Sequence, residues 1–231
     1  MRSFLRTTDR QLTRAVALVC LADGLVGAAF GAVTVDAGLP GWLPVLLSLV
    51  VFAGASQLLF IGVLAAGGGP IAAAVAGLLV NLRHLPFGFA VADVLHGGWW
   101  RRLVGAHLMT DEATAFTLAQ SDPAARRAAY WLSGIGVFLC WNAGVAAGVL
   151  GGRLVGDTDA LGLDAAFPAV LLALVLPSLR GDGSARRAVA VGSVVAVGTA
   201  LVLPAGLPVI AALIGLAAAG RGLRAAGPVA P

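Results

Sequence analysis

Three short polar motifs interrupt long apolar stretches of this chain: Phe52–Gln57, Asn81–Gly88 and Thr110–Glu112. An ionisable side chain at membrane depth costs roughly 2.5–3.5 kcal/mol, so it must face a cavity, a partner or a solute pathway. The motifs are therefore candidates for binding or moving a small polar solute.

The first motif combines small residues with two side chains that form hydrogen bonds. Gly54 and its small neighbours permit close backbone approach or local unwinding, while Ser56 and Gln57 add a hydroxyl and an amide. These groups could bind the two ends of a zwitterion. A hydrogen bond between tightly packed helices explains the same residues equally well.

The second motif places a permanent charge beside a group that titrates near neutral pH. The planar fork of Arg83 matches a carboxylate, His84 can exchange a proton, and Asn81 adds an amide. If the helix ended just before Asn81, the charges would lie at the interface and only set topology. Because apolar sequence resumes through Val91, we expect burial, with Arg83 paired to an acid.

The third motif brings two carboxylates together in an apolar setting. Asp111 and Glu112 repel each other and resist desolvation, so one of them could carry a proton, and both are natural partners for Arg83. Thr110 could instead cap a helix whose first turn holds the two acids. Both interpretations can hold. Asp23, within the first apolar run, is a further candidate for proton coupling or an ion pair.

The composition indicates that helices in a bilayer must position these motifs. Of 231 residues, 59% are hydrophobic and 11% charged, and the mean hydropathy is +0.96. Soluble domains are about half apolar and a quarter charged. Since a spanning helix needs about 20 apolar residues, we predict an all-α polytopic bundle of about seven or eight transmembrane segments. The chain, 1–231, would be a single transmembrane domain.

Hydropathy places the spans at 15–35, 43–65, 70–95, 103–120, 129–150, 164–180, 187–203 and 205–221. The 103–120 segment contains His107 and both motif acids, so it could be re-entrant or interfacial rather than spanning. The 70–95 segment could be broken.

Arginine supplies all the positive charge and falls in clusters between apolar runs, which suits loop topology better than a nucleic-acid groove. The clusters put both termini in the cytoplasm, with 1–14 and 222–231 as cytoplasmic segments. Arg101 and Arg102 break this pattern unless the 70–95 segment is broken. Asp23 interrupts the first apolar run, which favours a retained first helix over a cleaved signal.

Glycines recur every four residues at Gly27 and Gly31 and at Gly144, Gly148 and Gly152. This spacing lets helix backbones approach closely, and we interpret it mainly as packing within the chain. A fainter echo at an offset of 124 residues suggests that the first two spans repeat as the fifth and sixth.

Signatures of catalysis and of resident cofactors are missing from the sequence. There is no phosphate-binding glycine loop, GxSxG or HExxH. Cys20 and Cys140 lack the spacing of a zinc site or a disulfide framework. We expect no enzyme activity, no catalytic residue, no metal and no cofactor.

Taken together, in this order and near these spacings, the three motifs resemble the AzlC family of branched-chain amino-acid exporters. The resemblance is strong from about Gly24 to Phe116 and rests on hydropathy beyond. It implies a bacterial inner-membrane protein that exports valine, leucine, isoleucine and sometimes methionine. It also implies a small membrane partner of the AzlD type and energy from the proton gradient.

The resemblance makes Gly54–Gln57 a candidate substrate site and Arg83 a carboxylate ligand or the partner of an acid. An apolar pocket for a branched side chain could come from Phe52, Leu58, Phe87 and Phe89. The sequence departs from the family at Pro86-Phe87 and at Asp23, which leaves substrate range and coupling open. The alternatives are a non-transporting membrane scaffold and an exporter of another small carboxylate solute.

Overall fold

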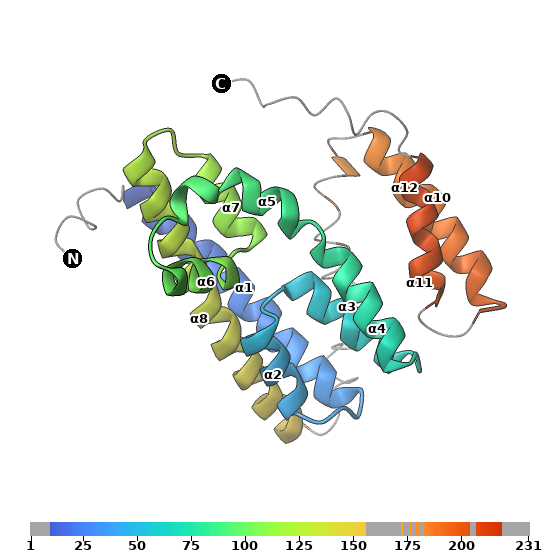
Figure 1. The fold of residues 1–231 in the computed structure, drawn as a ribbon. Helices are drawn as coiled ribbons and strands as arrows, with labels where there is room; N and C mark the ends of the chain where they lie inside the picture. The colour runs from blue at the N-terminus through green and yellow to red at the C-terminus, as the bar shows by residue number, and fades with distance from the viewer. Residues whose placement is uncertain are drawn as a thin grey trace. The chain divides into compact units, whose positions relative to one another are not determined.

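The computed structural model describes residues 10–155, 172, 176, 179–180, 183–203 and 207–218, and every regular element among them is helical (Figure 1). The all-α fold class is therefore confirmed. The chain divides into two compact units, one of Met1–Gln57 and Val80–Phe167 and the other of Leu58–Leu79 and Pro168–Pro231. We call them unit 1 and unit 2.

The helices follow one another with short connections. In chain order they are α1 (Arg10–Asp36), α2 (Trp42–Val50), α3 (Gly54–Ala65), α4 (Pro70–Asn81), α5 (His84–Ala90), the 3-10 turn η1 (Ala92–Val94), α6 (Trp99–His107), α7 (Asp111–Leu118), α8 (Pro123–Val155), α10 (Gly183–Ala200), α11 (Leu207–Ala211), the 3-10 turn η3 (Ala212–Ile214) and α12 (Gly215–Ala218).

The packing of α1 against α8 forms the centre of unit 1 and is its most extensive helix pair. Glycines make the approach possible. A Cβ on Gly27 would lie 2.7 Å from the carbonyl oxygen of Trp141, and one on Gly144 or Gly148 would collide with the backbone of α1. A Cβ on Gly152 would lie 3.2 Å from the Cα of Ala32. The predicted role of these glycines in packing within the chain is confirmed.

Three predicted spans are broken rather than continuous. The 43–65 segment forms α2 and α3, so the expectation of one span there is wrong; the break contains Phe52, whose φ of 43° no continuous helix allows. The 103–120 segment forms two short helices, α6 and α7, neither long enough to span. In the 70–95 segment α4 ends at Asn81 and α5 begins at His84, so the helix is interrupted there, although Pro70–Ala90 as a whole remains long and apolar enough to cross a membrane.

Burial explains why the chain tolerates the strained backbone at Phe52. Its ring is only 4% exposed and meets the ring of Phe138 edge-on at 4.9 Å between centroids. A non-glycine residue with positive φ costs of order 1–3 kcal/mol, while a buried aromatic side chain stabilises by a comparable amount.

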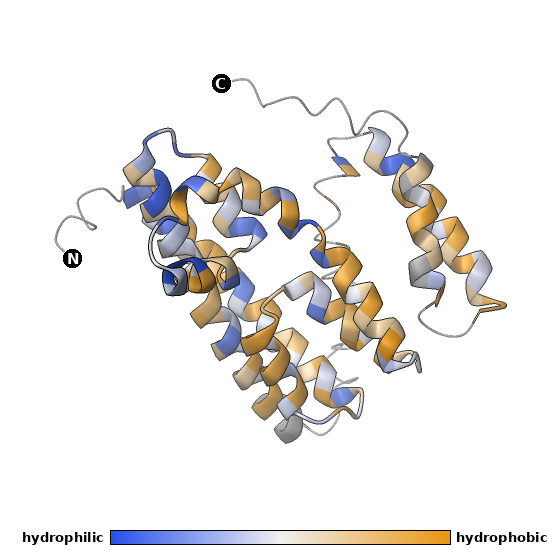
Figure 2. Cartoon of the chain, viewed as in Figure 1, coloured by the Kyte–Doolittle hydropathy of each residue, from blue (hydrophilic) through white to orange (hydrophobic). Residues whose placement is uncertain are grey.

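Three helical segments in the described part of the chain are long and apolar enough to cross a membrane: Arg10–Asp36, Pro70–Ala90 and Pro123–Gly152. Figure 2 shows hydrophobic colour along these segments and hydrophilic colour gathered around α6, α7 and the start of α8. The protein is therefore a membrane protein of the helical-bundle type. The predicted 164–180 span, most of the second half of the internal echo and both terminal tails lie largely outside the described residues.

Unit 2 contains two separate helical groups. The parts of α3 and α4 within it form a hairpin around Val63, Ala73 and Ala76. Further along the chain α10 packs against α11, η3 and α12, where a Cβ on Gly192 would lie 2.8 Å from the carbonyl oxygen of Ala212. The predicted spans at 187–203 and 205–221 correspond to these helices.

Candidate functional site

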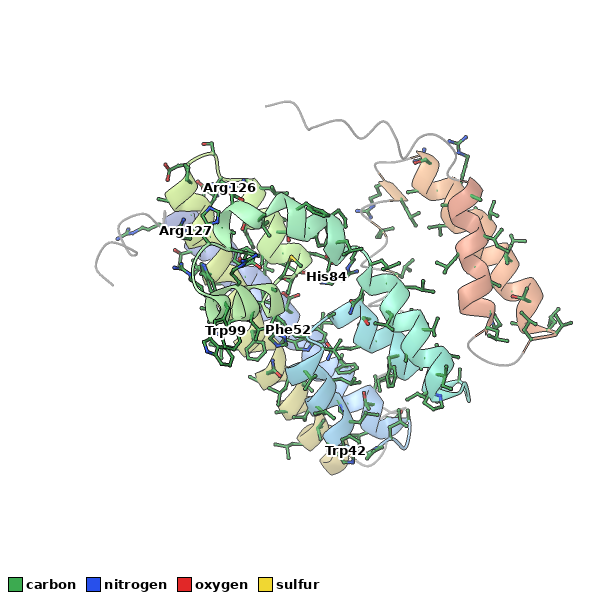
Figure 3. The ribbon with its side chains drawn as sticks, in the orientation of Figure 1. Trp42, Phe52, His84, Trp99, Arg126 and Arg127 are labelled. Carbon is green, nitrogen blue, oxygen red and sulfur yellow. The ribbon has the colours of Figure 1, made fainter. Side chains whose placement is uncertain are left out.

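The three helix breaks of unit 1 open onto one cavity of about 200 Å³. Each break contributes to its wall. The residues lining it are Val51, Phe52 and Ala53 between α2 and α3, Asn81 and His84 at the junction of α4 and α5, and Ala106, His107 and Met109 at the junction of α6 and α7. Non-helical backbone at membrane depth is tolerated where it is buried in protein or lines a cavity, so the breaks and the cavity have one explanation. Figure 3 shows Phe52 and His84 in the middle of this unit.

The second motif forms the junction between α4 and α5. Asn81 ends α4, Arg83 occupies the N-cap of α5, and His84 is its first residue. Nδ1 of His84 lies 3.1 Å from the backbone carbonyl oxygen of Asn81, and the side-chain oxygen of Asn81 is buried without a hydrogen-bond partner. The motif therefore presents an unsatisfied amide oxygen and an imidazole beside the cavity.

Arg83 forms the predicted ion pair with an acid of the third motif. Its Nη2 lies 3.1 Å from Oδ2 of Asp111, and the two side chains are 32% and 40% exposed. Nε of Arg83 and Oδ1 of Asp111 are both buried without a partner. The pair thus keeps hydrogen-bonding capacity on each side, which a bound carboxylate or ammonium could use.

The third motif begins a helix, as the alternative interpretation predicted. Thr110 has an extended backbone and accepts a hydrogen bond of 3.1 Å from the N–H of Ala113, so it caps α7. Asp111 and Glu112 occupy the first turn, where the helix dipole favours negative charge. Capping and ion pairing therefore coexist at Asp111.

The charges of the site do not balance. Asp23 lies close enough to Glu112 and Asp111 for their charges to act on it, and its Oδ2 is buried without a partner. Three carboxylates therefore lie near one another, and Arg83 pairs with one of them, Asp111. A group of this kind has room for a proton or for the ammonium of a solute.

The first motif lies against α8, next to a buried tryptophan. A Cβ on Gly54 would lie 3.1 Å from the ring of Trp141, so only glycine fits there without a shift. Gln57 is 1% exposed, and neither its amide nitrogen nor its oxygen has a partner; Ser56 is buried too. An unsatisfied buried amide costs about 1–3 kcal/mol, a cost that ligand binding could offset.

Two residues for which the sequence predicted no binding role belong to the site. His107 lines the cavity and its ring lies 5.9 Å from that of Phe52 and 5.8 Å from that of Phe138. Trp141 is buried and its indole N–H has no partner. A tryptophan at the centre of the apolar 129–150 run was the available signal.

The predicted apolar pocket is only partly present. Phe52 lines the cavity, whereas Phe89, which is 85% exposed, and Leu58, which is buried, do not line it. Phe87 is half-buried beside His84, at 5.9 Å between ring centroids.

Arg126 forms a set of hydrogen bonds, here called the arginine clamp, that connects helices around the start of α8. Arg126, near the start of α8, donates to both carboxylate oxygens of Asp93 in η1, at 2.7 and 2.9 Å. It also donates to the carbonyl oxygens of Ala90, at the end of α5, and of Thr117 in α7. The hydrogen bonds from Arg126 hold the pKa of Asp93 below its usual range. The clamp therefore joins α5, α7 and α8; Figure 3 labels Arg126.

Comparison with known proteins gives one positive result. The family described as AzlC protein matches residues 18–155, which include all three motifs, most of α1 and helices α2 to α8. Searches of curated proteins and of solved structures gave no significant match. The matched region covers more than half of the chain and carries every wall of the cavity, and we conclude that the chain belongs to the AzlC family.

Proposed function

We propose that this protein is the large membrane subunit of an exporter for the branched-chain amino acids valine, leucine and isoleucine, with unbranched methionine as a further substrate. The AzlC family is associated with branched-chain amino-acid transport. The observation that carries the proposal is the convergence of three helix breaks on one cavity beside the Arg83–Asp111 pair. Broken helices around a central site are typical of secondary transporters.

The site offers a suitable group for each part of such a substrate. The free Nε of Arg83 can bind the carboxylate, and the surplus acids Asp111, Glu112 and Asp23 can attract the ammonium. Phe52 supplies an apolar wall for a branched side chain. Gln57 and Asn81 have buried amide atoms without partners, and these can bind the substrate's polar end.

In the proposed mechanism Arg83 alternates between two anions. In one state it pairs with Asp111, as in the structure, and in the other it holds the substrate carboxylate. When Arg83 leaves the acid, Asp111 or Glu112 takes up a proton, so substrate moves outward as a proton moves inward. His84, next to Arg83 at the cavity wall, is placed to pass that proton.

The proposed setting is the bacterial inner membrane, with both termini in the cytoplasm and a small AzlD-type subunit as partner. The family generally works with such a subunit. The arginines at the start of α8 support this orientation, because cytoplasmic ends of spans carry an excess of basic residues.

The test is amino-acid efflux from bacterial cells that lack their own exporters and are loaded with a valine- or leucine-containing dipeptide. We expect efflux to require this chain and to increase with its AzlD-type partner. Arg83→Ala should reduce efflux by about tenfold or more, because a charge-assisted hydrogen bond to substrate is lost. Arg127→Gln, which changes an exposed arginine outside the cavity, is the matched control.

The outcomes separate the candidate functions. Wild-type efflux from a correctly inserted Arg83→Ala variant would refute the role of Arg83. Absence of efflux with and without the partner would favour a non-transporting scaffold. Efflux of another small carboxylate, but not of valine or leucine, would identify a different substrate class. Efflux that ignores an imposed pH gradient would refute proton coupling.

A further inference from the structure

The WWRR sequence that opens α6 has no part in the proposed transport site, and its arginines conflict with the simple topology drawn from the sequence. Two contacts hold this helix against α8. The hydroxyl of Tyr130 donates a 2.7 Å hydrogen bond to the carbonyl oxygen of Gly105, and the guanidinium of Arg101 lies 5.4 Å from the centre of the Trp131 ring. One face of α6 is thus attached to α8.

These contacts put Arg101 at the same end of α8 as the Arg126–Arg127 cluster. Trp131 follows Arg126 by five residues, a rise of about 7.5 Å along the helix. The two basic clusters therefore share one side of unit 1, an arrangement that eight regular spans would not give.

The face of α6 opposite its attachment is apolar and uncovered. Trp99 and Trp100 stack at 3.8 Å between ring centroids and are 64% and 62% exposed, and Leu103 and Val104 are exposed beside them. Figure 3 shows Trp99 at the margin of α6. Exposed tryptophans beside arginines on a short amphipathic helix are typical of the headgroup level of a membrane.

A second cavity, of about 570 Å³, lies between this helix and the turn that follows α5. Its wall carries the guanidinium of Arg102 and the imidazole of His96, which can donate a hydrogen bond, among small and apolar residues. Asp93, three residues before His96, is already bound at both oxygens by Arg126. No acid in the described part of the chain forms an ion pair with Arg102.

We propose that this cavity binds the phosphate of an anionic phospholipid headgroup. Arg102 and His96 face the phosphate, while the stacked tryptophans and Leu103 contact the upper part of the acyl chains. The positive charge matches an anionic lipid, and the adjoining apolar face of α6 matches a lipid rather than a free anion. The site is separate from the cavity beside Arg83, and its lining shares only Ala106 with that cavity.

The test is a lipid titration of the purified full-length protein in detergent, followed by native mass spectrometry. Phosphatidylglycerol and phosphatidylcholine with identical acyl chains are the two probes, and inorganic phosphate is the competitor. We expect the wild-type protein to bind phosphatidylglycerol about fivefold or more tightly than phosphatidylcholine. The attraction between one arginine and an anionic lipid is worth about 1 kcal/mol, which corresponds to a factor of about five. Arg102→Gln and His96→Gln should each reduce this preference, and Arg127→Gln should preserve it.

Each outcome of the lipid titration tests the phospholipid site independently of transport. Equal affinity for the two lipids in the wild-type protein would overturn the proposal. So would an unchanged preference in both cavity variants, or an equal loss in Arg127→Gln, which would indicate general surface charge. Displacement of phosphatidylglycerol by inorganic phosphate would show that the site takes a free anion instead. Because Arg102 and His96 are exposed, both variants should fold.

Discussion

The close approach of α1 to α8 can be tested by adding a single methyl group. In Gly148→Ala the new Cβ would lie 2.7 Å from the carbonyl carbon of Ala28 and 2.9 Å from its Cα. The new Cβ would also collide with the carbonyl oxygen of Ala28, its nearest neighbour. Ordinary contact begins at 3.4 Å, so α1 and α8 must separate by more than about 0.7 Å, the difference between 2.7 and 3.4 Å for the carbonyl carbon alone. Overpacking of this kind costs about 1–3 kcal/mol. We expect a loss of that size in the free energy of unfolding.

A matched control stands three residues further along the same helix. A Cβ on Gly151 meets nothing within 4 Å, so Gly151→Ala should be neutral or should stabilise by up to about 1 kcal/mol through helix propensity. Unfolding in SDS, followed by circular dichroism in mixed micelles, measures both variants. If they unfolded within about 0.5 kcal/mol of each other, the close approach of α1 and α8 would be refuted.

Three further predictions concern the site and its clamp. Gln57→Leu should raise the free energy of unfolding by about 1–3 kcal/mol, because it removes two buried polar atoms that have no hydrogen-bond partner. The same variant should lower amino-acid efflux, and a stable variant with normal efflux would exclude Gln57 from the site. Gly54→Ala should change the intrinsic fluorescence of Trp141, since its Cβ would lie 3.1 Å from that ring, and an unchanged spectrum would contradict the contact. Arg126→Gln should lower stability at pH 7 by at most about 1 kcal/mol, because the side chain of Asp93 is 48% exposed. The pKa of Asp93 in the folded protein lies below the unfolded value of about 3.9, so the stabilisation by the Arg126–Asp93 pair is present above about pH 4 and is lost at lower pH. The free energies of unfolding of the wild-type protein and of Arg126→Gln should therefore converge at acid pH.

Hydropathy and glycine spacing predicted the long helices well, because both properties are local in sequence. A run of apolar residues must be helical in a bilayer, where every backbone polar group needs an internal partner. Glycines four residues apart lie on one helix face, so Gly144 and Gly148 could be assigned to packing before any partner was known. The partner itself, α1, came only from the structure.

The chemistry of the site was also partly predictable. A lone arginine in an apolar stretch needs an acid, and few acids were available, so a pair between Arg83 and either Asp111 or Glu112 followed from charge, whereas the structure selected Asp111. The cap at Thr110 followed from the order of residue types, since a threonine before two acids is a common helix start. These inferences needed no coordinates.

Tertiary structure decided where the helices break and what the breaks enclose. Nothing in the apolar sequence around Phe52 requires a positive φ; the backbone adopts it because the ring can be buried against Phe138 on a helix almost ninety residues away. The same distance in sequence hid the roles of His107 and Trp141, which depend on what lies opposite them. Composition, periodicity and charge thus determined that this is a helical membrane protein with three polar motifs. That the helix breaks at these motifs line one cavity depended on packing between segments far apart in the sequence.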